Sequence, residues 1–446
     1  MHSKLNPPAY LILSILLLIS GMGYGRNTSS SADLFQDHSN PKLGKMIDMR
    51  PSELINEYQN AGTTLGPGMD NSSTPSWQFR DTMTDSVDLG WIQEFGSNTM
   101  PSSDVLTGLT VDDVGNVYVT GISDFSWLTI KYDASGTLLW SQTYTEAGIT
   151  DTYGDDILVD DDGNVYVTGY RWGPFIDSDI LLIKYDPSGT QQWLAEYAGA
   201  GLNNDFPNDI AIDPEGNIFI GGYSYSATVE SDFATLKFDN DGNLVWDVLF
   251  NGSAWADDWI TDIALDDSGN VYVAGVSTSE DSNADYGIIK YSADGTEEWV
   301  TLFDGITGTD WATSIALDTA GQTYVTGVSQ HYDDYIDYYT LKLDTAGTEL
   351  WGIRWGASGD GDSWASDIVV DDSMNVTVTG VSYGGEFGFD YVTVQWDSTG
   401  SESWVASYTN NLFGGYDEAT AMTLDSENNI IVTGVTESDS QTDDIV

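Results

Sequence analysis

The sequence predicts an all-β fold in which one four-stranded unit recurs along most of the chain. Two interleaved series of landmarks, each with seven members, support this prediction. A glycine that ends a Val-Tyr-Val-Thr-like segment recurs at Gly121, Gly169, Gly222, Gly275, Gly327, Gly380 and Gly434. A tryptophan that begins a later segment recurs at Trp91, Trp140, Trp193, Trp246, Trp299, Trp351 and Trp404. A repeat period near 53 residues is typical of stacked or circular repeat architectures.

The unit that contains Gly275 shows the expected strands most clearly. Two of its turns, 267–270 and 292–295, combine Asp, Ser or Asn with Gly, as tight hairpins require. The expected strands are residues 262–266, 271–275, 285–290 and 297–300. Four antiparallel strands at this period predict a blade, and seven such units predict a seven-bladed β-propeller.

The two ends of the repeat region predict how the ring closes. The last unit has its first two strands but ends at Val446, two residues into the third. The segment around Trp91 precedes any complete unit, so we expect this N-terminal strand to complete the last blade and remove its open edge. The alternative, which the incomplete third strand favours, is that the sequence is a fragment of a longer chain.

The repeat itself resembles a known family. The pattern Asp-Ile-Ala-Leu-Asp-x-x-Gly-Asn-Val-Tyr-Val-x-Gly, followed by Lys-Tyr-Asp-x-x-Gly-x-x-x-Trp, is similar to the SBBP repeat of bacterial secreted and surface proteins, over roughly residues 77–446. The first unit departs from it in a second-to-third connection five residues shorter than the others, and the sixth has Gln395 in place of lysine. The resemblance implies a seven-bladed β-propeller outside the cytoplasm and implies no reaction.

Composition excludes several classes of function. The chain has 71 acidic residues against 13 Lys and Arg, a net charge of −58, which disfavours binding to nucleic acids and anionic membranes. The absence of cysteine excludes disulfides, Cys-ligated zinc and thiol catalysis, and three histidines are too few for a His-rich metal site. The sequence contains no phosphate loop, dinucleotide fingerprint or zinc-protease motif.

The N-terminal region predicts export and three segments. Lys4, an apolar stretch over residues 9–20 and a Gly-Tyr-Gly site before Arg26 indicate a signal peptide over residues 1–25. Residues 26–75 are rich in Ser, Asn and Gly and predict a low-complexity linker or pro-segment. Residues 76–446 are the expected propeller, with its last repeat incomplete. We therefore expect a secreted or cell-surface protein without membrane insertion; the oligomeric state stays open.

Loop lengths indicate which face binds a ligand. The second-to-third and fourth-to-first connections are long and variable, and alternate turns of an antiparallel blade lie on opposite faces, so all variable connections share one face. Irregular aromatic and charged residues there suit sugar rings, which need stacking surfaces and hydrogen-bond acceptors. The candidate ligand-binding residues are Arg171, Trp172, Trp255, His331, Tyr332, Asp333, Asp334 and Tyr335.

One repeat position suggests calcium. An aspartate precedes the apolar core of the first strand at Asp156, Asp209, Asp262 and Asp367. A ring of carboxylates at the mouth of the channel suits Ca²⁺, which prefers several oxygen ligands. The competing interpretation is structural, with each aspartate accepting backbone N–H bonds from the next blade. At another repeat position, Lys131, Lys184, Lys237, Lys290 and Lys342 are expected to pair with carboxylates.

These patterns favour a secreted, non-enzymatic binding or scaffold module whose ligand is an extracellular glycan or protein. The alternatives are a structural repeat region of a larger surface adhesin and, less favoured, a carbohydrate-active hydrolase or lyase. No catalytic residue is assigned, because so many carboxylates leave any acid–base pair arbitrary.

Overall fold

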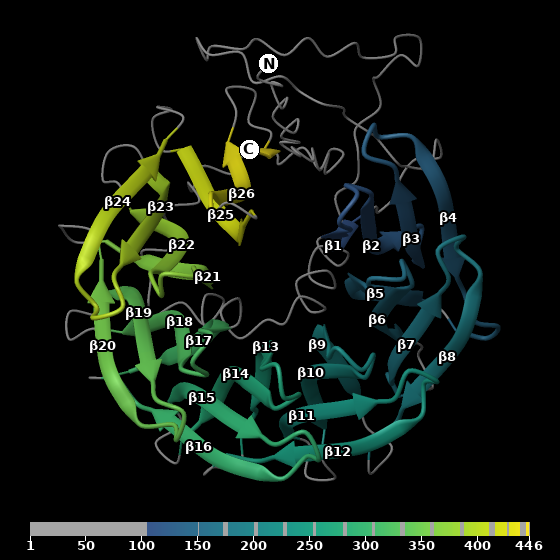
Figure 1. The fold of residues 1–446 in the computed structure, drawn as a ribbon, viewed down its shortest axis with the longest axis horizontal. Helices are drawn as coiled ribbons and strands as arrows, with labels where there is room; N and C mark the ends of the chain where they lie inside the picture. The colour runs from purple at the N-terminus through teal and green to yellow at the C-terminus, as the bar shows by residue number, and fades with distance from the viewer. Residues whose placement is uncertain are drawn as a thin grey trace, which may run out of the picture. The chain divides into compact units, whose positions relative to one another are not determined.

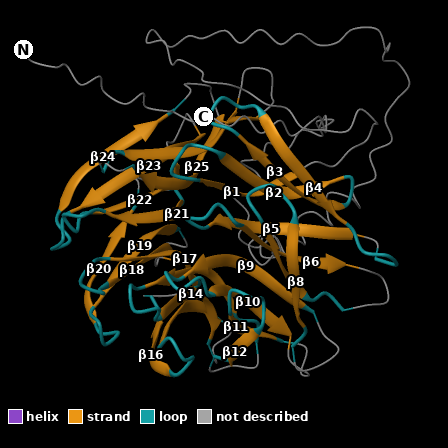
Figure 2. Ribbon diagram, turned by 45° about the vertical axis from the view of Figure 1, so that its right-hand side comes forward, coloured by secondary structure: helices purple, strands orange, loops and turns teal. Residues whose placement is uncertain are grey.

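The protein is described by a computed structural model that covers fourteen segments of the chain. They are residues 105–149, 151–172, 177–199, 204–225, 230–252, 256–279, 283–305, 308–330, 335–356, 361–383, 388–409, 415–425, 428–437 and 443–445. Within these segments only strands and connecting loops occur (Figure 2). The Trp91 segment and the predicted boundaries after residues 25 and 75 lie outside them.

The strands follow the predicted repeat. Blade one contains β1 (Val105–Val111), β2 (Val117–Ser123), β3 (Ser126–Tyr132) and β4 (Leu138–Tyr144). Blades two and three contain β5 (Asp151–Val159), β6 (Val165–Trp172), β7 (Ile180–Tyr185), β8 (Gln191–Tyr197), β9 (Asp205–Ile212), β10 (Ile218–Tyr225), β11 (Ser231–Phe238) and β12 (Leu244–Phe250). Blades four and five contain β13 (Trp259–Leu265), β14 (Val271–Thr278), β15 (Ala284–Tyr291), β16 (Glu297–Phe303), β17 (Asp310–Leu317), β18 (Thr323–Gln330), β19 (Ile336–Leu343) and β20 (Glu349–Trp355). Blade six contains β21 (Ser363–Val370), β22 (Val376–Tyr383), β23 (Gly388–Trp396) and β24 (Glu402–Tyr408), and β25 (Gly415–Leu424), β26 (Ile430–Glu437) and β27 (Asp443–Ile445) follow it.

Each blade is an antiparallel sheet of four consecutive strands, and successive blades follow one another around a common centre (Figure 1). The first strand of every blade lies innermost and the fourth outermost (Figure 1). Strands β25 to β27 are joined to the sixth blade by a short parallel pairing between β23 and β25. The all-β fold of repeated four-stranded blades is therefore confirmed, whereas a seventh four-stranded blade is not: the described residues supply three strands after the sixth blade.

Hairpin chemistry explains why the strands end where they do. In blade four the Asp266 carboxylate accepts the backbone N–H groups of Ser268 and Asn270 at 2.9 and 3.0 Å. Gly269 has a φ of 74°, which a residue with a Cβ adopts at a cost. The same Asp-x-x-Gly turn closes most hairpins between first and second strands, so the local sequence determines where the chain reverses direction.

The core lies between neighbouring blades. One buried cluster combines Tyr166 and Leu182 of blade two with Ile210, Ile220 and Leu236 of blade three. The second and third strands are almost wholly buried, whereas the outer strands alternate between exposed and half-buried residues. Because both faces of a blade are covered, the middle strands read as continuous apolar runs.

Five of the repeat tryptophans join an outer strand to the following blade. Trp193 of β8 donates its indole N–H to the Asn240 carbonyl of blade three at 3.1 Å. A Cβ on Gly242 would lie 2.9 Å from two ring carbons of Trp193, so glycine permits this close stacking. The same indole-to-carbonyl bond recurs from Trp140, Trp246, Trp299 and Trp351, at 3.2 to 3.4 Å.

The repeat lysines correct one expectation. Each ammonium lies 4.8 to 5.2 Å from the centre of an aromatic ring on the second strand of its own blade, as Lys184 does above Tyr166. Of the five, Lys237 and Lys290 also reach carboxylates, Asp213 and Glu298, at 3.8 and 2.8 Å. The common partner is thus an aromatic ring, because the lysine and the ring occupy paired positions on adjacent strands.

Candidate functional site

The variable connections share one face of the blades. The backbone N–H of Asp205, which begins β9, donates to the Ser178 carbonyl before β7 at 2.7 Å. The equivalent bond joins Asp258 to Ser231 between the next two blades, also at 2.7 Å. The connection before a third strand therefore lies beside the connection before the next first strand, and we call this the variable-loop face.

Three of the eight candidate ligand-binding residues are described. Arg171 and Trp172 end β6 in blade two, and Tyr335 lies directly before β19 in blade five. These blades are not neighbours, so the two positions belong to separate parts of the variable-loop face. Trp255, His331, Tyr332, Asp333 and Asp334 lie outside the described residues.

Arg171 is held by three carboxylates. Its guanidinium contacts Glu146 at 3.2 Å and Glu196 at 2.6 Å, and it also bonds Asp179. The Arg171 side chain is 16% exposed, so these contacts offset the cost of burying a cation. Trp172, the next residue of β6, is 38% exposed.

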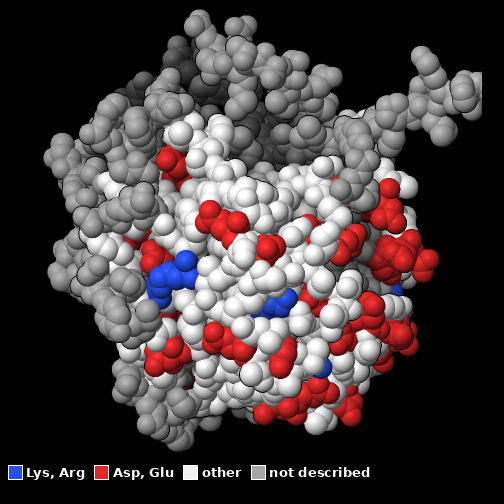
Figure 3. Space-filling view, turned by 60° about the vertical axis from the view of Figure 1, so that its left-hand side comes forward, with Lys and Arg blue, Asp and Glu red and all other residues white. Residues whose placement is uncertain are grey.

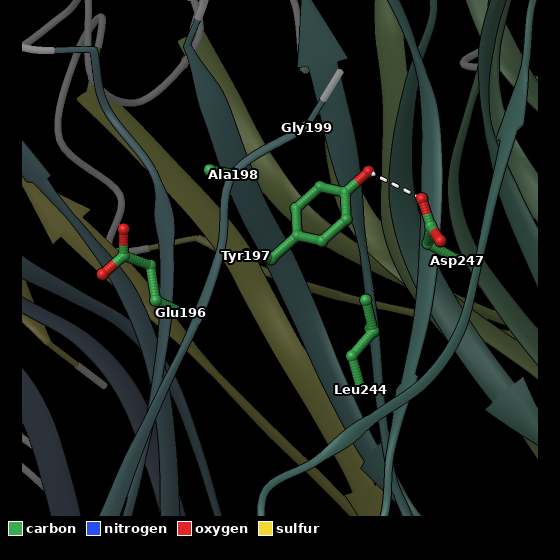
Figure 4. A pocket seen from close by; sticks show the side chains of 6 residues that line it. All are labelled: Glu196, Tyr197, Ala198, Gly199, Leu244 and Asp247. Atoms are coloured by element: carbon green, nitrogen blue, oxygen red, sulfur yellow. Dashed lines mark hydrogen bonds between the residues drawn. The ribbon is translucent and has the colours of Figure 1, made fainter. Parts of the chain in front are cut away.

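A pocket of about 370 Å³, lined by both polar and apolar residues, adjoins this cluster. Its lining comes from β8, from the connection after it and from β12, and Figure 4 shows the Tyr197 hydroxyl directed at Asp247. That hydroxyl donates to the Asp247 carboxylate at 3.2 Å, and burial together with this carboxylate raises the pKa of Tyr197. Glu196 belongs both to the pocket lining and to the contacts of Arg171, so the two features are continuous.

The four aspartates predicted as a calcium ring lie on the innermost strands. Asp209 Oδ2 accepts the backbone N–H of Ile263 in the next blade at 2.8 Å, and Asp367 Oδ2 accepts that of Met422 at 2.6 Å. Asp156 hydrogen-bonds Asp209, and Asp209 hydrogen-bonds Asp262. The bonds from Ile263 and Met422 are the backbone N–H bonds that the structural interpretation expects, and calcium binding at this ring stays a prediction.

The close packing of these four aspartates also shifts the pKa of their carboxyl groups. The surrounding protein desolvates Asp209 and, with the nearby charge of Asp156, raises its pKa to about 7. Desolvation also raises the pKa of Asp156, Asp262 and Asp367. Each of these side chains still has some solvent access. Neighbouring carboxyl groups in such a ring share protons rather than ionise fully.

A second acidic series follows the blade interfaces on the variable-loop face. The first residue of β17, Asp310, is fully buried, and its Oδ2 accepts the Gly305 N–H at 3.0 Å. Asp285 near the start of β15 and Asp304 after β16 place one carboxylate oxygen each within 4.8 Å of one another and of Asp310. Sequence analysis did not predict this cluster. The available signal was the acidic residue at position 304, where the preceding blade has Asn251.

Acidic side chains are more frequent than basic ones on the face that Figure 3 shows. Many separate patches of Asp and Glu appear on the face in Figure 3, where Lys and Arg are few. This distribution follows from the net charge of −58 and opposes contact with polyanions. No helix in the described part of the chain is long and apolar enough to cross a membrane.

Comparison with protein families identifies the repeat. Residues 90–125, 140–176, 192–227 and 252–281 match the model of SBBP, described as a beta-propeller repeat. The chain carries SBBP repeats. The second match runs from Trp140 on β4 to residue 176, beyond the end of β6, so an SBBP repeat crosses from the outer strand of one blade into the next. No match to a curated protein sequence is found.

Solved structures similar to this SBBP-repeat chain share little sequence with it. An ulvan lyase of polysaccharide lyase family PL25 is 13% identical, with a TM-score of 0.49, over 75% of this chain and 90% of the lyase. The periplasmic gluconolactonase of Pseudomonas aeruginosa is 12% identical, with a TM-score of 0.43, over 76% of this chain and 89% of that one. A protein from Lactobacillus plantarum is 15% identical, with a TM-score of 0.46, over 68% of this chain and 84% of that one.

Proposed function

We propose that this chain is a non-enzymatic binding module that holds a neutral oligosaccharide on its variable-loop face. The observation that supports this most directly is the exposed Trp172, which follows Arg171 on β6, while Arg171 pairs with Glu196 of the pocket lining. Sugar rings stack on aromatic faces, and their hydroxyl groups donate to carboxylates. Asp247 supplies such an acceptor at the pocket.

The charge of the molecule supports a neutral rather than an acidic glycan. With a net charge of −58, the surface repels sulfated or uronic-acid-rich chains at low salt. The carboxylates at the pocket are also already engaged: Glu196 pairs with Arg171, and Asp247 accepts from Tyr197. Paired carboxylates of this kind suit hydrogen bonding to a ligand and favour binding over hydrolysis.

The test is a glycan array with neutral and sulfated oligosaccharides, followed by calorimetry on the best neutral oligosaccharide. Trp172→Ala should weaken binding about tenfold, equivalent to about 1.4 kcal/mol. The matched control is Trp404→Ala, since Trp404 is 36% exposed on the outer strand β24. Equal affinities of the two variants, binding to sulfated chains only, or cleavage of the bound oligosaccharide would each contradict the proposal.

We also propose that the ring has seven blades and that the Trp91 segment completes the last one. Strands β25 to β27 provide three strands after the sixth blade, and the first SBBP match begins at residue 90, as later matches begin at or beside Trp140 and Trp193. Trp91→Ala should therefore destabilise the protein by about 3 kcal/mol, as expected for a packed aromatic residue. A variant that melts with the wild type would contradict this closure.

Secretion is a third part of the proposal and rests on the sequence of residues 1–25. Expression in a bacterial host with an intact export pathway should yield a mature protein that begins at Arg26 outside the cytoplasm. N-terminal sequencing of the exported and cytoplasmic fractions measures this. Recovery of the uncleaved chain in the cytoplasm alone would show that the segment is not a signal peptide.

A further inference from the structure

The shortest second-to-third connection of the six blades carries an exposed aromatic residue. In blade one, Asp124 and Phe125 alone join β2 to β3, and Ser123 pairs with Ser126 across the turn. The equivalent connections of blades two to six have four to seven residues. Phe125 is 45% exposed. Blade one therefore has a tight turn with an exposed apolar residue on the variable-loop face.

The backbone of this turn is one that phenylalanine adopts at a cost. Asp124 and Phe125 have φ values of 48° and 63°, and a type I′ turn requires positive φ at both of its central residues. Aspartate is common at the first of these positions and glycine at the second, where a Cβ raises the free energy of the backbone. Turn chemistry therefore does not explain Phe125. Such exceptions are expected where a side chain takes part in binding.

Hydrogen bonds fix this turn on the first strand of blade two. The Phe125 carbonyl accepts the backbone N–H of Thr152 at 3.1 Å. The Thr152 hydroxyl in turn accepts the backbone N–H of Trp127, on β3, at 2.9 Å. Thr152 and Trp127 are almost fully buried, at 2% and 1% exposure. The exposed Phe125 thus stands on a buried junction between two blades, which holds its position.

The same strand links Phe125 to the proposed oligosaccharide site. Thr152 pairs with Arg171 of β6, and Trp172 is the next residue of that strand. Phe125 and the end of β6 are therefore separated by two strand spacings, roughly 10 Å. Three aromatic residues of the described chain are exposed as much as Trp172 or nearly so, and the third, Trp404, lies on the outer strand β24. Phe125 and Trp172 are thus the two that share the variable-loop face.

We propose that Phe125 is a second sugar-stacking residue, so that the binding site extends from blade two onto blade one and prefers oligosaccharides to monosaccharides. This inference rests on the proposed oligosaccharide binding. An aromatic ring packs against the C–H face of one sugar. Two such residues roughly two strand spacings apart require a ligand of several sugars, and a single sugar reaches only one of them.

A second strained apolar residue provides the matched control. Met374 occupies the glycine position of the Asp-x-x-Gly hairpin in blade six, with a φ of 62° and 37% exposure. That hairpin joins a first strand to a second strand, so it lies on the face opposite the variable connections. Strain and exposure are common to Met374 and Phe125, and only their faces differ.

Calorimetric titration of the full chain with the best neutral oligosaccharide of the glycan array tests the proposal. Phe125→Gly removes the ring and fits the positive φ, and its dissociation constant should rise about tenfold. Met374→Gly relieves the same strain on the opposite face and should stay within about twofold of the wild type. Phe125→Tyr keeps an aromatic ring and should also stay within about twofold.

The monosaccharide from which that oligosaccharide is built provides a second measurement, by NMR titration. Phe125→Gly should leave the monosaccharide dissociation constant within about twofold of the wild type, because a single sugar binds beside Trp172. Unchanged oligosaccharide affinity in Phe125→Gly, an equal loss in Met374→Gly, or an equal loss of monosaccharide affinity would overturn this inference and leave the proposed function standing. A wild type that binds no neutral oligosaccharide would overturn both.

Discussion

The Asp262 carboxylate hydrogen-bonds the Ile315 backbone across the junction of two blades. Its Oδ2 accepts the Ile315 N–H at 2.8 Å, and its Oδ1 accepts the N–H of Ile263 in its own strand, also at 2.8 Å. The Ser314 hydroxyl donates to Asp262 at 2.7 Å and lies 3.0 Å from Asp367 Oδ1, which carries the connection into blade six. The innermost strands are therefore joined by side chains rather than by a continuous sheet.

Loss of this acceptor should destabilise the protein. Asp262→Ala leaves the Ile315 N–H and the Ser314 hydroxyl without their partner, which should cost about 1–3 kcal/mol in the free energy of unfolding. Urea denaturation at about pH 5.5 measures it, because lower pH reduces repulsion between neighbouring carboxylates. Asp262→Asn retains an acceptor oxygen and should recover at least half of the loss. Equal midpoints for the Ala and Asn variants would contradict this role.

The aspartate ring should also make stability depend on pH. The pKa of Asp209 in the folded protein, about 7, lies above its unfolded value near 4, so the folded state binds more protons between these limits. The free energy of unfolding therefore falls as pH rises from about 4 to about 7. The melting temperature should be higher at about pH 5.5 than at about pH 8.

Replacement of the titrating group separates this effect from general charge repulsion. Asp209→Asn should reduce the fall in melting temperature between these two pH values, measured at constant ionic strength. Glu215→Gln removes the same charge from an exposed hairpin and should keep the wild-type slope. If both variants keep it, the ring does not control the pH dependence.

Two hairpin glycines distinguish backbone strain from contact between blades. Gly242 and Gly163 have φ values of 83° and 79°, so alanine at either position should cost about 1 kcal/mol through strain alone. A Cβ at Gly242 would also lie 2.9 Å from the Trp193 ring, whereas at Gly163 the nearest atom is 3.5 Å away. Gly242→Ala should therefore lower the melting temperature well beyond Gly163→Ala. Equal losses would show that the tryptophan contact adds nothing.

The segment before the repeats should be dispensable for stability. Residues 26–70 have little periodic apolar sequence, so deletion of the segment should leave the melting temperature of the remaining chain within about 2 °C of the wild type. Differential scanning calorimetry of the two forms measures this. A drop of several degrees would indicate that the segment packs against the repeats.

The strands and turns of each blade were predictable because they depend on residues close together in the sequence. The expected strands 262–266, 271–275, 285–290 and 297–300 lie within or beside β13 to β16, and the Asp-x-x-Gly turns form where the spacing placed them. Apolar runs of period two and hairpin turns each depend on a few consecutive residues, so the sequence alone shows where they occur. The shared face of the variable connections follows from the same alternation.

The partners of charged side chains were not predictable in the same way. The lysines at one repeat position were expected to meet carboxylates, yet Lys131 and Lys342 lie over the Tyr118 and Tyr324 rings. The sequence shows the register of neither strand, and the ring lies opposite the lysine only after the two strands pair. In so acidic a chain, composition favours a carboxylate as the partner of each lysine, and it gives no sign of the aromatic ring.

The sequence by itself determined the repeating four-stranded unit, its turns and the acidic surface, because these depend on composition and on contacts between near neighbours. Only the tertiary structure decided which carboxylates meet: Asp285 and Asp310 are 25 positions apart and belong to different blades. Their approach depends on the angle and spacing at which one sheet packs on the next. That geometry comes from the summed packing of both blades, and no short stretch of sequence encodes it.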